Sequence, residues 1–398
     1  MPADRRLRLC ALGNANSVAV QINTRCFARR GHQVAILSPI PAPATDLEIL
    51  TPTIGHSSTL RRAASYRQML GLLRRWQPDI LLLHVASLPF NWLLPLVWLK
   101  PFVITLAGAD ILFHQRPDLS PRRRRATLDL LDIADGIISR SDYMLAPYPK
   151  LQAKAMVSPW GVDVDLFANG SPNHRSLTRA SLGLDDRTPV VVSPRRVVPI
   201  CGVATIVEAM PLVRERVPGA ALVLVDDQPE PDYRRLVVDR IEQLGMASSI
   251  TWISALEHDD MPSLYRLADV TVSVARSDGI SSTVLESMAA RRPVVLGDIP
   301  NYEGIFDRAH CRMVDPQDPR SVADGIVDML TRRELRDTIV EQAYAKVAAY
   351  GNLAREAERI EALLVRLVDA PARPRRLLAR LRHATNLALV AFEPDTKR

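Results

Sequence analysis

The chain has 398 residues, of which 47% are hydrophobic and 24% are charged. This composition is typical of globular proteins and excludes a disordered or fibrous chain, and the length suits two domains of ordinary size. The net charge of +7 favours an anionic partner without distinguishing nucleic acid, acidic lipid and a phosphorylated small molecule.

The first half of the chain alternates strand and helix patterns. A strand pattern at Leu7–Leu12 is followed by a glycine turn, a helical pattern that runs through Arg30, and a second strand pattern at Val34–Leu37. This order is typical of a doubly wound parallel sheet. The alternation continues with strand patterns at Asp79–Leu83, Phe102–Leu106 and Gly136–Ser139, the last preceded by a helical run that begins at Arg122.

Residues 80–113 are the one strongly apolar region. Three prolines, Asn91 and Lys100 interrupt it, so that no apolar window reaches the ~20 residues that a spanning helix needs. We interpret the region as two buried strands flanking a short apolar helix. The alternative that part of this region forms a surface in contact with lipid is kept.

The targeting and redox signals are weak. The apolar stretch after the basic N-terminus is interrupted at Gly13, Asn14 and Asn16, so a cleaved signal peptide is not expected. The four cysteines form no CxxC pair, which argues against a zinc site or a disulfide framework and favours a reducing cytoplasm.

A polar stretch from Ala168 to Thr188 separates the two halves. We expect an N-terminal domain over 1–168, a linker over 169–188, a second domain over 189–350, and C-terminal helices with a basic tail over 351–398. The second domain repeats the alternation, with strand patterns at Pro189–Ser193, Ala220–Val225, Ile250–Ile253, Val270–Val274 and Val294–Leu296, and helical patterns at Gly202–Val217, Tyr233–Leu244, Met261–Ala268 and Thr283–Ala290.

The tail is an amphipathic basic segment. It has arginines at positions 373, 375, 376, 380 and 382, and these stand beside apolar residues at 377, 378, 381, 387, 389 and 390. Two interpretations fit: a terminal helix packed on the body of the protein, or a helix lying on an anionic membrane.

The segment "SDGISSTVLESMAARRPVV" places two carboxylates near one predicted helix start. Asp278 lies in the polar loop after a strand, and Ser281–Thr283 begin the helix, where free N–H groups and the helix dipole can bind an anion. Glu286 lies about one turn into that helix. The alternative is structural, because Thr283 and Glu286 also match the T-x-x-E capping box.

A second candidate anion site is "SPRRVVPICGVATIVEA". Arg195 and Arg196 follow a strand end, and Gly202 opens a helix. The guanidinium donors suit phosphate oxygens, whereas a solvated arginine pair is the alternative.

Together these motifs resemble the retaining, nucleotide-sugar-dependent glycosyltransferases of family GT4, which have the GT-B fold. The likeness runs from Leu9 to about Leu330. It is strongest at "LESMAARRPVV", which is similar to the usual "LEAMACGKPVV", and includes "GNANS", "RGHQVAILS", "HVAS", "TLAGAD" and "SPWGVDVDLF". The resemblance implies an α/β chain of two Rossmann-like, doubly wound parallel-sheet domains that face each other across a cleft.

The resemblance also implies site residues. Glu286 would bind the ribose of the nucleotide, Asp278 the hydroxyls of the donor sugar, and Arg196 the diphosphate. Asp110 and His84 would line the acceptor side. The remaining donor-binding candidates are Gly13 and Asn14 from the first domain, and Arg195, Gly202, Gly279, Ile280, Ser281, Ser282 and Thr283 from the second.

The implied reaction transfers a glycosyl unit with retention, by attack on the same face, to a glycan, lipid-linked or small-molecule acceptor. Polysaccharide biosynthesis is a typical setting. We expect no cofactor besides the nucleotide-sugar donor and no metal, because no Asp-x-Asp pair suits one. A cytoplasmic protein is expected, with peripheral membrane contact through the C-terminal basic helix as an open alternative.

Four positions depart from the family pattern. Cys201 replaces a usual lysine, Ala107 a His or Trp, Ala19 a frequent His, and Arg291 a usual glycine. A non-catalytic relative that binds a nucleotide sugar or a partner enzyme is therefore the alternative. A nucleic-acid binder that uses Arg122–Arg125 and the tail is less favoured, because few aromatic residues are available for stacking.

Overall fold

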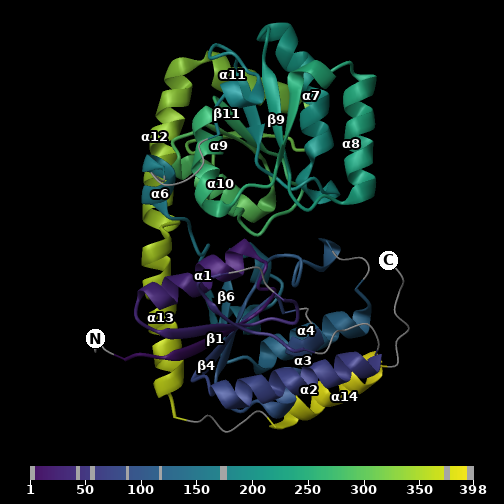
Figure 1. Cartoon of the computed structure of the whole chain (residues 1–398), viewed down its shortest axis with the longest axis vertical. Coiled ribbons are helices and arrows are strands. Elements are labelled where there is room, and N and C mark those ends of the chain that lie inside the picture. The colour runs from purple at the N-terminus through teal and green to yellow at the C-terminus, as the bar shows by residue number, and fades with distance from the viewer. Residues whose placement is uncertain are drawn as a thin grey trace. The chain divides into compact units, whose positions relative to one another are not determined.

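The computed structural model describes residues 5–41, 45–53, 59–86, 89–115, 119–170, 177–371 and 377–391. The chain divides into two compact units. Unit 1 comprises Met1–Trp160 and Ala354–Arg398, and unit 2 comprises Gly161–Leu353. Each unit is an α/β body built on a parallel sheet (Figure 1).

Unit 1 contains a seven-stranded sheet in the order β3-β2-β1-β4-β5-β6-β7. Every neighbouring pair is parallel. The central strands are continuous apolar runs because both faces of a parallel sheet are covered. The strands are β1 (Arg8–Leu12), β2 (Gln33–Leu37), β3 (Glu48–Leu50), β4 (Ile80–His84), β5 (Phe102–Thr105), β6 (Gly136–Ser139) and β7 (Ala155–Val157).

Helices cover both faces of this sheet (Figure 1). On one face, Ile360 and Leu364 of α13 pack with Phe27 of α1 against the strands. On the other, Leu73 of α2 and Leu130 of α4 belong to a second apolar cluster. The helices of unit 1 are α1 (Val18–Arg29), α2 (Thr59–Trp76), α3 (Pro89–Val97), α4 (Pro121–Ile133), α5 (Pro149–Gln152), α13 (Leu353–Asp369, which begins at the last residue of unit 2) and α14 (Leu377–Ala391).

Unit 2 contains a six-stranded parallel sheet in the order β10-β9-β8-β11-β12-β13. The central pair, β8 and β11, places two strand ends side by side. The strands are β8 (Val190–Ser193), β9 (Ala221–Asp226), β10 (Ile250–Ser254), β11 (Val270–Ser273), β12 (Val294–Gly297) and β13 (Arg312–Val314). The helices are α6 (Val164–Asn169), α7 (Val203–Arg216), α8 (Pro231–Gln243), α9 (Met261–Leu267), α10 (Ser282–Ala289), α11 (Pro319–Thr331) and α12 (Arg333–Tyr350).

The sequence-based assignment of residues 80–113 is confirmed. Two buried strands, β4 and β5, flank the short apolar helix α3. In the part of the chain that the structure describes, no helix is both long enough and apolar enough to cross a bilayer.

The division of the chain differs from the predicted boundaries. Unit 1 ends at Trp160, before the expected boundary at Ala168, and it regains the chain from Ala354 onward. The reason is packing, since the apolar side of α13 completes the core of unit 1. The predicted linker 169–188 lies in unit 2, where Arg179 pairs with Asp269. Its residues 171–176 lie outside the described ones, as do 372–376 and 392–398 of the predicted tail.

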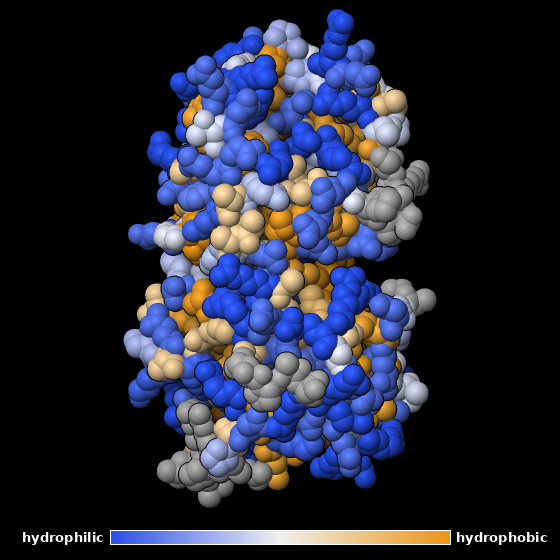
Figure 2. All heavy atoms as spheres, turned by 90° about the vertical axis from the view of Figure 1, so that its left-hand side faces the viewer, coloured by the Kyte–Doolittle hydropathy of each residue, from blue (hydrophilic) through white to orange (hydrophobic). Residues whose placement is uncertain are grey.

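Hydrophilic residues cover much of the face of unit 1 on which α13 lies (Figure 2). Helix α13 contributes to this surface because it is amphipathic. Its Ile360 is buried, whereas Glu358 and Arg359 are exposed. Half-buried helices of this kind separate apolar and charged residues at the helical period.

Candidate active site

An ion pair joins the two central strand ends of unit 2. Arg195 follows β8 and Asp278 follows β11, and Arg195 Nη1 lies 2.9 Å from Asp278 Oδ2. Both side chains are largely buried, with 11% and 12% of their surfaces exposed. The parallel arrangement explains the encounter, because the carboxyl ends of neighbouring parallel strands meet at one edge of the sheet.

The Asp278 carboxylate has three donors. Besides Arg195, the Tyr302 hydroxyl donates to Oδ2 at 2.9 Å and the Gly279 N–H donates to Oδ1 at 2.8 Å. Asn301 Nδ2 donates to the backbone carbonyl of Asp278. Partners from three segments therefore fix the orientation of this carboxylate, as a site that recognises one particular hydroxyl requires.

Glu286 is buried and hydrogen-bonded to a tyrosine. The Tyr265 hydroxyl donates to Glu286 Oε2 at 2.8 Å, and the residue is 5% exposed. Burial raises the pKa of this carboxyl from 4.5 to about 7, although the Tyr265 hydrogen bond works in the opposite direction. The carboxyl of Glu286 therefore titrates near neutral pH.

The structure excludes the capping-box alternative for Glu286. Helix α10 begins at Ser282 with Ser281 as its N-cap, so Thr283 is already inside the helix. A capping box would require its acid at the third helical position, which is Val284. The local pattern matched the motif, but the helix begins earlier than the pattern requires.

Arg195 acts electrostatically on two tyrosines of the site. Burial is the main cause that raises the pKa of both Tyr265 and Tyr302, and the positive charge of Arg195 lowers the pKa of each. One cation therefore influences both Tyr302, the partner of Asp278, and Tyr265, the partner of Glu286. Its Nη2 also lies 3.6 Å from Cys201 Sγ, so the guanidinium reaches the position where the lysine of the family pattern is missing.

Arg196 has a different environment from Arg195. Its side chain is exposed, and Nη2 donates to the Gln228 carbonyl at 2.9 Å. Gly202 lies nearby at the start of α7 with φ +69°, and a Cβ there would be 2.5 Å from the Val274 carbonyl oxygen. Glycine at this position lets the start of α7 approach the end of β11 closely.

The loop between β11 and α10 holds an unusual backbone conformation. Ile280 has φ +66°, which is unfavourable for a β-branched side chain, and the residue is buried. Ser281 Oγ and Thr283 Oγ1 lie 2.7 Å apart at the helix start, with Ser282 between them. Strain of this kind persists where the surrounding structure fixes the loop, and it is concentrated at functional sites.

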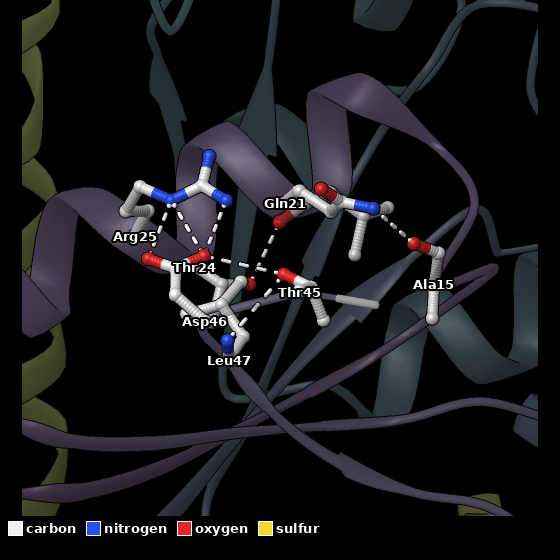
Figure 3. A network of polar contacts seen from close by, with 8 residues as sticks. Ala15, Gln21, Thr24, Arg25, Thr45, Asp46 and Leu47 are labelled. Atoms are coloured by element: carbon white, nitrogen blue, oxygen red, sulfur yellow. Dashed lines mark hydrogen bonds and ion pairs between the residues drawn. The ribbon is translucent and has the colours of Figure 1, made fainter. Parts of the chain in front are cut away.

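In unit 1 the structure brings Gly13 and His84 together. A Cβ on Gly13 would lie 3.2 Å from His84 Cβ, a tight contact that glycine avoids. The following loop is held by Ala15, whose N–H donates to Ser38 Oγ and whose carbonyl accepts from Gln21. Figure 3 shows this contact beside the Arg25–Asp46 ion pair.

Asn14 differs from Gly13 in being exposed, at the tip of the turn that leads into α1. Its Oδ1 accepts the Asn16 N–H at 2.9 Å, and its carbonyl accepts from Ser17. These two contacts fix the turn in which Asn14 is exposed.

Asp110 links two loops at the carboxyl edge of the unit 1 sheet. Its Oδ2 accepts the Ala86 N–H at 3.0 Å, while Oδ1 accepts the N–H groups of Ala107 and Gly108. Burial raises the pKa of Asp110, and the backbone donors lower it. Asp110 therefore holds together the loops that follow β4 and β5. His84, the other acceptor-side candidate, is neutral because burial lowers its pKa to about 4.

Two family profiles match the chain one after the other. Glycosyltransferase Family 4 matches residues 19–194 and Glycosyl transferases group 1 matches residues 174–346, so that together they span 19–346. The chain belongs to the family 4 glycosyltransferases.

Curated relatives of this family 4 chain match over part of their length. A GDP-mannose-dependent alpha-(1-6)-phosphatidylinositol monomannoside mannosyltransferase of Mycobacterium tuberculosis is 32% identical over 184 residues, which are 44% of this chain and 46% of the relative. An alpha-D-kanosaminyltransferase of Streptomyces kanamyceticus is 28% identical over 47% of each chain. The matched stretch thus spans about half the length of these relatives.

Solved structures confirm the GT-B fold. Sucrose-phosphate synthase of Thermosynechococcus elongatus superposes with a TM-score of 0.76 at 17% identity, covering 92% of this chain and all of the other. A protein of Anabaena solved in complex with UDP and glucose gives a TM-score of 0.76 at 16% identity, covering 90% of this chain and all of the other.

One departure of this glycosyltransferase chain from its family has a structural explanation. Arg291, which replaces a usual glycine, has φ +54°, a conformation that favours glycine. Its guanidinium lies 3.8 Å from the centre of the Tyr344 ring and pairs with Glu341. These contacts offset part of the backbone strain, so the change lies outside the chemistry of the site.

Three residues of the site were not predicted from the sequence of this family 4 chain. Tyr265 comes from α9, and Asn301 and Tyr302 come from the turn after β12. The sequence signal for Asn301 and Tyr302 was weak, namely a polar and an aromatic residue a few positions after a buried strand. Tyr265 carries no local signal, because its role depends on which helix packs beside α10.

The first testable consequence concerns the stability of this enzyme fold. We expect Glu286→Gln to stabilise the protein above pH 7 by up to about 3 kcal/mol, because the folded state raises the pKa of Glu286 from 4.5 to about 7. The stabilisation that the protonated wild-type carboxyl provides is complete below pH 4.5 and is lost as the pH rises through 7. Urea unfolding at several pH values measures this difference, and a less stable variant at pH 8 would contradict the expectation.

Proposed function

We propose that this chain is an active, retaining glycosyltransferase that moves a sugar from a nucleotide-diphosphate sugar to a glycan, lipid-linked or small-molecule acceptor. The observation that carries the proposal is the pair of oriented, buried carboxylates in unit 2: Asp278, held by Arg195 and Tyr302, and Glu286, held by Tyr265. A buried cation and two oriented carboxylates are costly to maintain, and a protein that only binds a partner has little use for them.

In this proposal each carboxylate contacts a different part of the donor. Glu286 accepts the ribose hydroxyls, and Asp278 accepts the hydroxyls of the donor sugar. The backbone N–H groups of Ser282 and Thr283 at the start of α10 face the diphosphate. Exposed Arg196, which follows β8, binds the same phosphates from solvent.

The chemistry depends on stabilising the leaving group. Negative charge develops on the nucleoside diphosphate as the bond to the anomeric carbon breaks, and positive groups directed at that charge lower the barrier. The family pattern supplies a lysine where this chain has Cys201. We propose that Arg195, whose guanidinium reaches Cys201, supplies the missing positive charge while it also orients Asp278.

The donor that we propose to test first is GDP-mannose. The basis is the GDP-mannose-dependent mannosyltransferase of Mycobacterium tuberculosis, which is 32% identical to this chain over 184 residues. UDP-glucose is the second choice, because the Anabaena structure contains UDP and glucose. On the acceptor side we propose His84 and the loops that Asp110 holds, together with Gly13 and Asn14 near the phosphates.

The direct test measures donor binding and turnover of the full chain. We expect GDP-mannose or another nucleotide sugar to raise the melting temperature, and Glu286→Ala and Arg196→Ala to reduce this shift strongly. Slow hydrolysis of the donor should release nucleoside diphosphate equally well with EDTA present. The anomeric configuration of a transferred sugar, read by NMR, tests retention.

The outcomes separate the proposal from its alternative. A melting shift without any release of nucleotide, with a panel of acceptors present, would indicate a non-catalytic relative that binds a nucleotide sugar. No shift with any GDP, UDP or ADP sugar would contradict the proposal for the donor site, and would direct attention to a partner enzyme.

A further inference from the structure

The exposed face of α3 is apolar, although it belongs to a helix with a buried opposite face. Its side chains Leu93, Leu96 and Val97, and Leu99 in the turn that follows, are between 37% and 54% exposed. The spacing of the three helical residues, i, i+3 and i+4, places them on one side of the helix. We call these four residues the α3 patch.

The α3 patch is a concentration of apolar surface within the described part of the chain. Of the ten large apolar residues that are exposed there, four form the patch and a fifth, Leu381, lies on α14. Helix α14 packs beside α3, because Arg380 donates to the Trp98 carbonyl and His383 bonds the Trp92 carbonyl. Isolated exposed leucines are common, whereas a group of them marks a surface that binds something.

Three segments that are distant in the sequence meet around this patch. Helix α4, with Arg122–Arg125 at its start, contacts both α3 and α14. Helix α4 brings its four arginines into the same part of unit 1 as α3, and Arg380 of α14 reaches the turn beside Leu99. Among residues 89–100, 121–133 and 377–391 there are seven lysines and arginines but only two acidic residues, Asp129 and Asp132.

The two acidic residues are already paired. Arg382 lies 3.0 Å from Asp129 and 3.2 Å from Asp132. The remaining surface around the patch is thus apolar and cationic, with Arg122 and Lys100 exposed. Lys100 Nζ donates to the Pro78 carbonyl at 2.7 Å, a neutral acceptor that leaves the positive charge uncompensated. The aliphatic stem of a lysine at such a border can lie along apolar surface while its ammonium group reaches phosphate groups.

We propose that the α3 patch, with its border of basic residues, is the surface through which this protein docks on an anionic lipid bilayer. Its side chains enter the boundary between headgroups and acyl chains, and the basic residues contact lipid phosphates. Of the two regions that the sequence left open for lipid contact, the apolar stretch within residues 80–113 and the basic tail, this assigns the contact to the face of α3 in the first. Helix α14 instead packs on the body of unit 1, with Arg382 bound to Asp129 and Asp132.

Other occupants fit the surface less well. A second copy of the chain would bring the basic borders together without free acidic residues to offset them. A nucleic acid would match the charge, but the patch consists of aliphatic side chains that offer no stacking surface for bases. A lipid surface satisfies both the apolar and the cationic character.

The test uses the full chain and vesicle flotation at low salt. We expect binding to vesicles of equal parts phosphatidylglycerol and phosphatidylcholine, and little binding to phosphatidylcholine alone. Leu96→Glu/Val97→Glu should weaken binding at least about tenfold, because two charges replace inserted apolar groups. Lys100→Glu should weaken it by at least about fivefold, and added salt should weaken wild-type binding.

The matched control is Leu236→Glu on α8 of unit 2. Leu236 is 52% exposed, so that the same change at a similar exposure should leave vesicle binding unaltered. Thermal unfolding shows that each variant is folded at the assay temperature, which matters most for Lys100→Glu because it also removes the hydrogen bond to the Pro78 carbonyl. Equal binding by the α3 variant, no binding to anionic vesicles, or preferential binding to an oligonucleotide would each overturn the proposal. Self-association that the α3 variant abolishes would overturn it as well.

The result is independent of catalysis. Vesicle binding involves neither Glu286 nor Arg195, so Glu286→Ala should dock as the wild type does. Docking by a wild-type protein that binds no donor would contradict the proposed function alone. Donor binding by a wild-type protein that does not dock would contradict the docking surface alone.

Discussion

Arg195→Met should lower kcat/KM by about two to three orders of magnitude, as the loss of one preorganised donor for developing negative charge typically does. The guanidinium that lies 2.9 Å from Asp278 and 3.6 Å from Cys201 would be gone, together with the orientation of the carboxylate. Initial rates of nucleotide release, measured over a range of donor concentrations, give the change.

Rescue separates the charge from a purely structural role. Removing one partner of a buried ion pair also destabilises the fold, so each variant must first be shown to be folded at the assay temperature. Adding Cys201→Lys to Arg195→Met should recover at least about tenfold in rate, since a charge-assisted bond contributes roughly 1.5–3 kcal/mol. Arg216→Met, which breaks a surface pair with Asp324, is the matched control. A stable Arg195→Met protein with wild-type kinetics would refute the assignment.

The affinity for the nucleotide should depend on pH through Glu286. Ribose hydroxyls donate hydrogen bonds to the ionised carboxylate, so the ligand binds best to the form that predominates above a pKa of about 7. Affinity should be constant above that pH and should fall by up to tenfold per pH unit below it. Calorimetry in two buffers of different ionisation enthalpy should detect the release of about half a proton per nucleotide at pH 7.

Glu286→Gln tests the same contact with the ribose by removing the charge of the carboxylate. The amide oxygen can still accept from Tyr265, but the charge is absent. We expect affinity about tenfold to a hundredfold weaker at pH 8 and nearly independent of pH. The variant would then be more stable than the wild type and bind less well, a trade-off common at active sites. If wild-type affinity were the same at pH 5.5 as at about pH 8, the ribose would not contact this carboxylate.

Much of the architecture could be predicted because local sequence patterns indicate the strands and helices. Continuous apolar runs between glycine or polar turns indicated β1, β4, β8 and β11 within one or two residues. The strand ends then placed Arg195 and Asp278 at one edge of a sheet. Strand β3 and helix α2 were not predicted, since three edge residues carry no period and α2 is weakly amphipathic.

The partners within the site could not be predicted for a physical reason. A hydrogen bond such as that from Tyr265 to Glu286 depends on how α9 packs beside α10, and no spacing along the chain encodes that distance. The same limit explains the capping box, where four residues matched a motif although the helix began elsewhere. Whether the placed residues act as the family resemblance implies stays a prediction.

The discontinuous course of unit 1 has a consequence for how the protein is made. The chain leaves unit 1 at Trp160 and returns only at Ala354, and Ile360 and Leu364 of α13 are buried against its sheet. During synthesis the first 160 residues therefore leave the ribosome with one sheet face covered by α1 but not yet by α13. Unit 2 is continuous and can fold before α13 is synthesised and completes unit 1. A ribosome stalled before α13 would carry a partly exposed apolar sheet face, which is the kind of surface that chaperones bind.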